Sequence, residues 1–210
     1  MEQNKYLEDI SEIKNMMSRS SRFISLSGIS GILAGIYALI GAYLAHSILV
    51  KNPLYMFSSK TDVTRYSMLN LNNLYFIAIG VIIAAAITGV LLTLKKSRES
   101  GEKMWDVTSK RLVFNFLIPL FTGGLFCLSL IQNEIYGLVA PATLLFYGLA
   151  CVNASKYTLR DVRYLGFANI IIGLIATQFI GYGLYFWALG FGVFHILYGS
   201  IMYFKYDKKN

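Results

Sequence analysis

Five stretches of this chain contain no Asp, Glu, Lys or Arg, and each is at least 21 residues long. They are residues 23–50, 67–94, 112–133, 135–155 and 164–204. A helix needs about 20 mostly apolar residues to cross the ~30 Å hydrocarbon layer of a bilayer. Each of the first four stretches therefore predicts one transmembrane helix, and the last, with 41 residues, predicts two.

The composition agrees with a chain that lies mostly in lipid. Apolar residues make up 56% of it and charged residues 14%, against about 45–50% and about 25% in soluble domains. A soluble fold of 210 residues could not cover so much apolar surface with so few charges. We therefore predict an all-α fold, a polytopic transmembrane helical bundle.

Six spans are predicted, arranged as three helical hairpins: 24–48, 73–94, 112–132, 135–153, 164–180 and 183–204. The last apolar run is divided at Gly181 and Gly183, because glycine is the usual residue of a tight turn. The predicted organisation is a cytoplasmic amphipathic segment over 1–22, a six-helix membrane domain over 23–204 and a cytoplasmic tail over 205–210.

The first 22 residues are polar and carry four acidic side chains, so we expect no cleavable signal peptide. Apolar residues recur there at helical spacing, at Tyr6, Ile10, Ile13 and Met17. A short amphipathic helix is the expected result. Such a helix would lie against the inner leaflet, or it would dock a cytoplasmic partner.

Lys and Arg are divided unevenly between the two sides of the predicted membrane. Sixteen lie in the N-terminal segment, the second and fourth connections and the C-terminal tail, and three lie in the first connection. The side richer in Lys and Arg is normally cytoplasmic, so both termini are predicted to be cytoplasmic. The distribution also argues against nucleic acid as a partner of this chain of net charge +8, since nucleic-acid-binding residues gather on one face or arm.

The segment SLSGISG, from Ser25 to Gly31, and the segment over residues 185–202 are distinctive within this sequence. In both, the chain resembles a group of uncharacterised bacterial six-span integral membrane proteins. The resemblance implies a multi-pass protein of the bacterial inner membrane. It implies no activity, because none is known to us for that group, and it therefore supplies a cellular context without a mechanism.

The predicted spans contain no Asp, Glu, Lys or Arg. Ion-coupled transporters usually need such a group to bind or relay charge. Enzymes that work in the lipid phase need a nucleophile with a base, a set of metal ligands or a pair of carboxylates. The sequence contains none of these combinations. We therefore predict no catalytic residue, no metal site and no cofactor.

Four polar side chains are the remaining candidates for a ligand site or polar cluster: His195, Asn169, Asn115 and Tyr147. Counted at ~1.5 Å per residue, they fall within the inner half of the bilayer. If they converge, they form a polar pocket in which Asn169 is the expected hydrogen-bond partner of His195. If they do not, each holds two helices together, which is the commoner role of polar residues in membranes.

Small residues recur every four positions on the first span, at Ser27, Gly31 and Gly35. Residues at this spacing share one face of a helix and let a second helix backbone approach closely. The sequence therefore predicts a helix-packing stripe on the first span. Its replacement by bulky side chains should destabilise the bundle.

Two functions fit this pattern. The first is a non-enzymatic accessory or regulatory membrane module, which binds another membrane or cytoplasmic protein and has the lipid bilayer as its other partner. The alternative is a passive channel or carrier for a small neutral solute, which the uncharged spans and a pocket at His195 and Asn169 would favour. Self-association into an oligomer is compatible with both.

Overall fold

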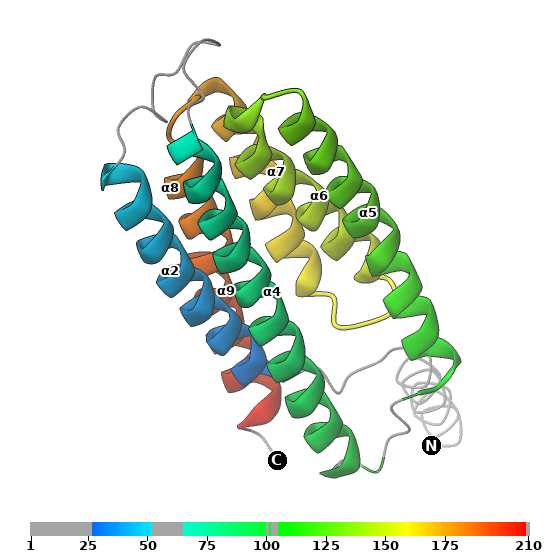
Figure 1. Cartoon of the computed structure of the whole chain (residues 1–210). Helices are drawn as coiled ribbons and strands as arrows, with labels where there is room; N and C mark the ends of the chain where they lie inside the picture. The colour runs from blue at the N-terminus through cyan, green and yellow to red at the C-terminus, as the bar shows by residue number, and fades with distance from the viewer. Residues whose placement is uncertain (1–26, 52–64, 100, 102–104, 209–210) are drawn as a thin grey trace, which may run out of the picture.

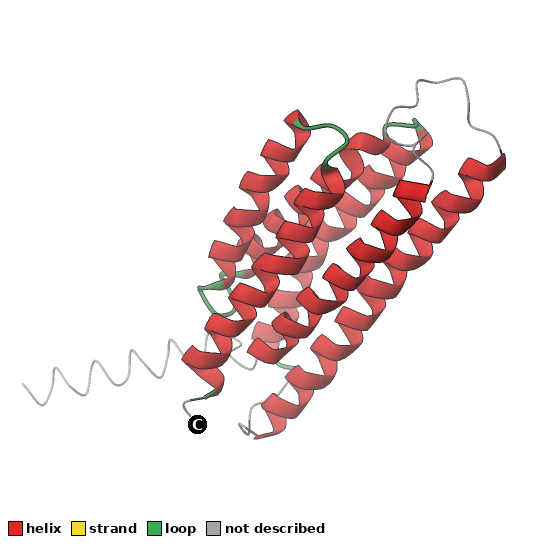
Figure 2. Cartoon of the chain, turned by 90° about the vertical axis from the view of Figure 1, so that its left-hand side faces the viewer, coloured by secondary structure: helices red, strands yellow, loops and turns green. Residues whose placement is uncertain are grey.

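The structure is a computed structural model of the chain and describes residues 27–51, 65–99, 101 and 105–208. Helices account for nearly all of this part of the chain (Figures 1 and 2). The expectation of an all-α fold is therefore confirmed for it. The amphipathic helix expected over residues 1–22 lies outside the described residues.

The long helices are α2 (Gly28–Lys51), α4 (Arg65–Glu99), α5 (Val107–Gln132), α6 (Val139–Ala154) and α7 (Val162–Gln178). The 3-10 turn η1 (Tyr136–Leu138) precedes α6. The last segment is continuous and consists of α8 (Gly183–Trp187), the π-helical turn η2 (Ala188–Val193), α9 (Phe194–Met202) and the π-helical turn η3 (Tyr203–Asp207). Among the described residues, five helical segments are long and apolar enough to cross a membrane, and α7 is a shorter apolar helix of 17 residues.

The helices begin and end several residues away from the predicted limits of the spans. α4 begins at Arg65 where the prediction began at 73, and α5 begins at Val107 where it began at 112. An apolar run marks the part of a helix that suits lipid, whereas the backbone hydrogen bonds of a helix continue into its polar flanks. Hydropathy therefore locates these helices but not their ends.

The helices lie side by side in one bundle (Figure 1). α6 packs most extensively against α7 and α5, and α2 packs most extensively against α4 and α9. α4 has α2 as its principal neighbour, and only 6% of its most apolar stretch is buried. α4 is therefore a peripheral helix, attached to the rest of the bundle along one face.

Residues with positive φ occur in the turns at Gly101, Glu134 and Gly181. Gly181, between α7 and α8, has a φ of +95°, which is strained for a residue with a side chain. The sequence placed the break of the last apolar run at this glycine, and the structure confirms it. The turn that follows α5 places Glu134 at a φ of +60°.

Glycines mark the places where helix backbones touch. A Cβ added to Gly35 of α2 would lie 2.6 Å from the carbonyl oxygen of Gly192, and one added to Gly31 would lie 3.1 Å from the Cα of Gly199. Both Gly31 and Gly35 therefore face the last helical segment. Ser27, the third residue of the predicted stripe, lies just before α2, and its carbonyl accepts a hydrogen bond from the Ser30 hydroxyl. Gly148 of α6 and Gly166 of α7 form a second crossing of this kind.

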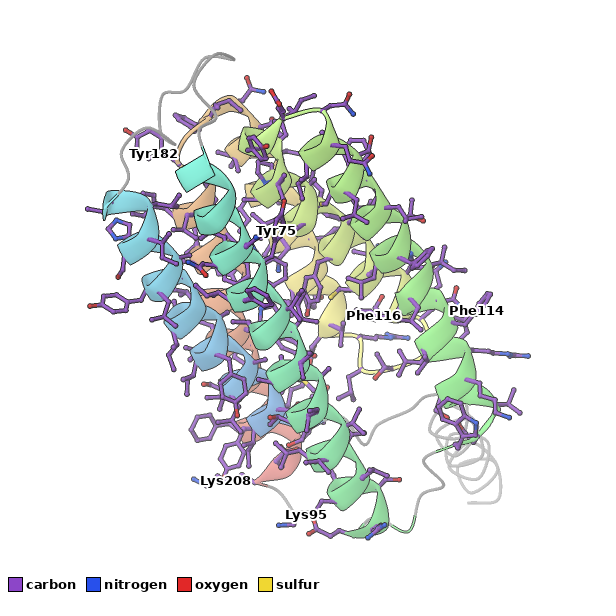
Figure 3. All side chains as sticks on the ribbon, viewed as in Figure 1. Tyr75, Lys95, Phe114, Phe116, Tyr182 and Lys208 are labelled. Atoms are coloured by element: carbon purple, nitrogen blue, oxygen red, sulfur yellow. The ribbon has the colours of Figure 1, made fainter. Side chains whose placement is uncertain are left out.

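Charged side chains gather at one end of the bundle, which we call the basic end. Figure 3 shows Lys95 and Lys208 there and Tyr182 at the opposite end. Asp207 joins three helical segments at the basic end, because its carboxylate accepts hydrogen bonds from the backbone N–H of Gly28 at 2.9 Å and from Lys96 Nζ at 2.6 Å. This ion pair is the second attachment of α4, beside its packing on α2.

α5 begins at the basic end with a capping box. The backbone N–H of Ser109 donates to Asp106 Oδ1 at 2.7 Å, and the backbone N–H of Asp106 donates to Ser109 Oγ at 2.9 Å. Each side chain thus satisfies a backbone donor that the first turn of a helix leaves without a partner. Partial burial opposes ionisation of Asp106, but the hydrogen bonds from Ser109 outweigh it and hold the pKa of the carboxyl below its ordinary value.

Candidate functional site

A hydrogen bond between Tyr147 of α6 and His195 of α9 lies inside the bundle. The Tyr147 hydroxyl is 2.6 Å from His195 Nε2, and His195 Nδ1 is 3.0 Å from the carbonyl oxygen of Gly190. A carbonyl oxygen can only accept, so Nδ1 carries a hydrogen. In the neutral ring Nε2 is then an acceptor, and the Tyr147 hydroxyl donates to it. Only 7% of His195 is exposed.

The π-helical turn η2 places the histidine ring. His195 follows Gly190 by five residues, and the wide turn brings Nδ1 within reach of the Gly190 carbonyl. Gly190 has no room for a side chain, since an added Cβ would lie 2.6 Å from Asn169 Oδ1 and 2.8 Å from Ile172 Cδ1. π-helical turns inside α-helices are frequent at functional sites. The turn η2 sets the position of His195 along the bundle and the direction of its ring, and His195 is the only histidine inside the described bundle core.

Aromatic rings surround the pair. The Phe191 ring lies 5.8 Å from the His195 ring and 5.0 Å from the Tyr147 ring, and the Phe116 ring meets Tyr147 edge-on at 6.0 Å. Trp187 extends the group, with its ring 5.0 Å from that of Phe191. Hydrogen bonds are stronger in such apolar surroundings than in water. The Tyr147–His195 hydrogen bond is therefore a specific contact between α6 and α9.

Asn169 does not bond to His195, contrary to the pairing that the sequence suggested. Its side-chain amide donates to the Leu165 carbonyl of its own helix at 2.9 Å, and its Oδ1 has no hydrogen-bond partner. Asn169 and His195 lie on neighbouring helices, but the direction of each side chain around its helix decides the contact. α7 turns Asn169 toward Gly190, while α6 supplies the partner of the histidine.

Asn115 belongs to a different contact, between α5 and α6. Asn153 Nδ2 donates to the Asn115 carbonyl at 2.9 Å and lies 3.3 Å from Asn115 Oδ1. The Asn115 side chain in turn donates to the Arg111 carbonyl at 2.8 Å. The structure thus brings together Tyr147 and His195 directly, places Asn169 against the same π-helical turn, and places Asn115 elsewhere.

Three residues that the sequence analysis did not select lie beside these polar groups. Asn153 is the partner of Asn115, and its position two residues before the end of the fourth apolar run was the only signal for it. Tyr198 lies three residues after His195, and its buried hydroxyl has no hydrogen-bond partner. Cys151 is a buried free thiol one turn after Tyr147. Residues three or four positions apart share one face of a helix. The sequence could therefore have identified Tyr198 from His195 and Cys151 from Tyr147.

The arrangement is suited to holding helices together and offers little to a reaction. Tyr147 and His195 could exchange a proton with each other. Their mutual hydrogen bond, however, already uses the Tyr147 hydroxyl and His195 Nε2, the atoms that a substrate would need. Within the part of the chain that the structure describes, no three His, Cys, Asp or Glu side chains are grouped as a metal site requires. The other histidine, His46, is separate from the pair, and its Nε2 lies 3.2 Å from the Tyr185 hydroxyl.

Comparisons with protein-family models, with curated proteins and with solved structures found no match to this chain. The resemblance to bacterial six-span membrane proteins therefore stays a prediction from residues 25–31 and 185–202.

Proposed function

We propose that this chain is a non-enzymatic accessory or regulatory module of the bacterial inner membrane, with six spans and cytoplasmic termini. α7 would be the fifth span, since this mostly apolar helix of 17 residues continues into the apolar turn that ends at Gly181. The basic end would face the cytoplasm, in agreement with the usual excess of Lys and Arg on that side.

The peripheral helix α4 is the observation that carries this proposal. It is a 35-residue helix that has α2 as its principal neighbour and leaves most of its apolar side chains uncovered. Its exposed residues include Phe76 at 73%, Ile82 at 65% and Ile83 at 51%. A helix attached along one face keeps its other faces available for a helix of another membrane protein, which is the contact an accessory module needs.

The interior of the bundle supports the same conclusion. The buried polar groups between α6 and α9 and between α5 and α6 are mostly engaged with each other, as Tyr147 is with His195 and Asn153 with Asn115. Helix backbones touch at the crossing of Gly148 and Gly166 and at that of Gly35 and Gly192. An interior closed by such contacts serves as a scaffold, and the surface is left to carry the function.

Site-specific photocrosslinking in cells tests the role of α4. A photoreactive amino acid at Ile83, on an exposed face of α4, should give a discrete adduct with a second membrane protein. The matched control is Leu128 of α5, which is exposed to a similar extent at 54% and should give no such adduct. Mass spectrometry of the adduct, together with purification of the untreated complex, identifies the partner.

Two outcomes would contradict the role of α4 as a contact surface for another protein. Equal adducts from the α4 and α5 positions would show that neither face is selective. An adduct of twice the mass of the chain at Ile83 would show self-association, and the α4 surface would then serve an oligomer of this protein.

A passive channel or carrier for a small neutral solute is the second candidate. One observation favours it, because Asn169 Oδ1 and the Tyr198 hydroxyl are buried without hydrogen-bond partners and could bond to a small polar solute. In proteoliposomes, a channel would accelerate the entry of glycerol or urea, and Asn169→Ala would alter that rate. Permeability equal to that of empty liposomes would exclude this function for those solutes.

A further inference from the structure

We propose that the basic end carries a binding site for the phosphate of an anionic phospholipid, formed by α5, the connection after α6 and the start of α7. Five side chains form the α5–α7 basic cluster: Lys110, Arg111, Lys156, Arg160 and Arg163. All five are exposed. The inference does not depend on whether the protein is a module or a channel.

A hydrogen bond between α5 and α6 brings the α5 members of the cluster and Lys156 to the same side of the bundle, and the other two arginines follow in the connection to α7 and in its first turn. Asn153 of α6 contacts Asn115 of α5 at 2.9 Å. Arg111 lies one turn from Asn115 toward the basic end, and Lys156 lies three residues beyond Asn153 in the same direction. Both therefore emerge just beyond a fixed contact between the two helices. Arg160 and Arg163 are joined across the first turn of α7, whose Arg163 N–H donates to the Arg160 carbonyl at 3.1 Å.

The charge of this cluster is not balanced by acidic side chains of the described chain. The carboxylates at the basic end are already engaged: Asp106 caps α5, Asp161 accepts from Lys205 at 2.7 Å and from the Tyr206 hydroxyl at 2.9 Å, and Asp207 binds Lys96. Glu99 lies 4.0 Å from Lys95 on α4. Among the described residues, no member of the cluster forms an ion pair. Five like charges on neighbouring elements favour an anion from outside the chain.

Exposed aromatic and apolar residues beside the cluster identify the anion as a lipid headgroup. Trp105 is 65% exposed and lies 6.0 Å from Lys110 Nζ, and the Arg163 guanidinium lies 5.1 Å from the Phe167 ring. Aromatic rings of this kind favour the level of lipid headgroups. Phe114 is 67% exposed on the outside of α5 (Figure 3). It lies three residues after Arg111, in the direction that leads from the basic end to the apolar part of the bundle. A phospholipid whose phosphate binds the cluster would thus place its acyl chains against α5.

Native mass spectrometry of the purified full-length protein in detergent tests the site. Titration with phosphatidylglycerol should give bound lipid at concentrations where phosphatidylcholine gives little. The triple variant R111Q/K156Q/R163Q should bind phosphatidylglycerol about 100-fold more weakly, because each basic residue near a membrane surface contributes about fivefold, or ~1 kcal/mol. If the triple variant does not fold, K110Q/R160Q should show a weakening of about 25-fold by the same reasoning.

The matched control is K95Q/R98Q/K208Q, which removes the same number of charges from other parts of the basic end. It should retain phosphatidylglycerol affinity within about threefold, because those side chains lie on α4 and at the end of η3. An equal loss in both triple variants would show diffuse attraction and overturn the site. Equal binding of phosphatidylcholine by the unaltered protein would do the same. Displacement of the lipid by millimolar inorganic phosphate would show that the site recognises free phosphate, which would also overturn the proposal.

Discussion

Replacing Tyr147 by Phe removes one hydroxyl from the middle of the bundle and changes little else. The ring contacts with Phe191 at 5.0 Å and with Phe116 at 6.0 Å can persist, since both involve the ring alone. His195 Nε2 loses its partner at 2.6 Å, while Nδ1 keeps the Gly190 carbonyl. The variant therefore removes the buried hydrogen bond to His195 together with the contact of the same hydroxyl with the Cys151 thiol.

The expected loss in the free energy of unfolding is about 1–2 kcal/mol. Leaving a buried acceptor without a partner costs about 1–3 kcal/mol, whereas hydrogen bonds between membrane helices contribute ~0.6 kcal/mol on average and ~1.7 kcal/mol at most. The short distance and the 7% exposure of His195 place this bond near the upper end of the membrane range. Unfolding by SDS in mixed micelles, followed by circular dichroism, measures the difference.

Tyr198 provides the matched control, because its buried hydroxyl has no partner. Tyr198→Phe removes the same hydroxyl from α9, the helix of His195, and should leave stability unchanged or raise it, since an unsatisfied polar atom is lost. In a His195→Phe background, the effect of Tyr147→Phe should fall below ~0.5 kcal/mol. Equal destabilisation by Tyr147→Phe and Tyr198→Phe would refute the hydrogen bond as the source of the effect.

Three further predictions concern packing, capping and topology. Gly31→Leu should lower the free energy of unfolding in detergent by about 1–3 kcal/mol, because an added Cβ already lies 3.1 Å from a backbone atom of α9. Asp106→Ala should cost about 1 kcal/mol near pH 7 through loss of the α5 cap. The pKa of Asp106 is lowered in the folded protein, so its contribution is complete above the unfolded pKa of ~3.9 and is lost as the pH falls through the folded value; Asp106→Asn should keep the cap without this pH dependence. In a background without native cysteines, Asn133→Cys should react with an impermeant maleimide in intact cells and Lys156→Cys only after permeabilisation; equal labelling would contradict the six-span topology.

Hydropathy predicted an all-α chain with several apolar helices of membrane-spanning length, because lipid-exposed residues must be apolar along a whole helix. It also located the turn at Gly181, where two signals coincide, a run too long for one span and a glycine in the left-handed region. The helix ends were less well predicted. At the start of α5, the capping box of Asp106 and Ser109 begins the helix before the apolar run begins.

The partner of His195 could not be predicted from depth alone. Residues at similar depth on two helices meet only if both side chains point to the same side, and the direction of a side chain around its helix depends on every contact that the helix makes. Here the π-helical turn adds a local change of direction just before His195. The small residues Gly190 and Gly192 are compatible with close packing or a kink, but no propensity distinguishes a π-helical turn from an α-helical one at such a sequence.

The packing stripe of α2 and the buried pair belong to the same helical segment, and this links their energetics. The segment from η2 to α9 contacts α2 through Gly192 and Gly199 and contacts α6 through His195. A Cβ added to Gly31 would lie 3.6 Å from the His195 backbone carbonyl, so α2 touches the same residue whose ring binds Tyr147. A shift of α9 away from α2 must therefore press His195 against Tyr147, whereas a shift toward α2 must stretch their short hydrogen bond and bring helix backbones into collision. The segment is fixed from two sides, by close backbone packing on one and a directional bond on the other, whereas α4 has no comparable second neighbour among the described helices.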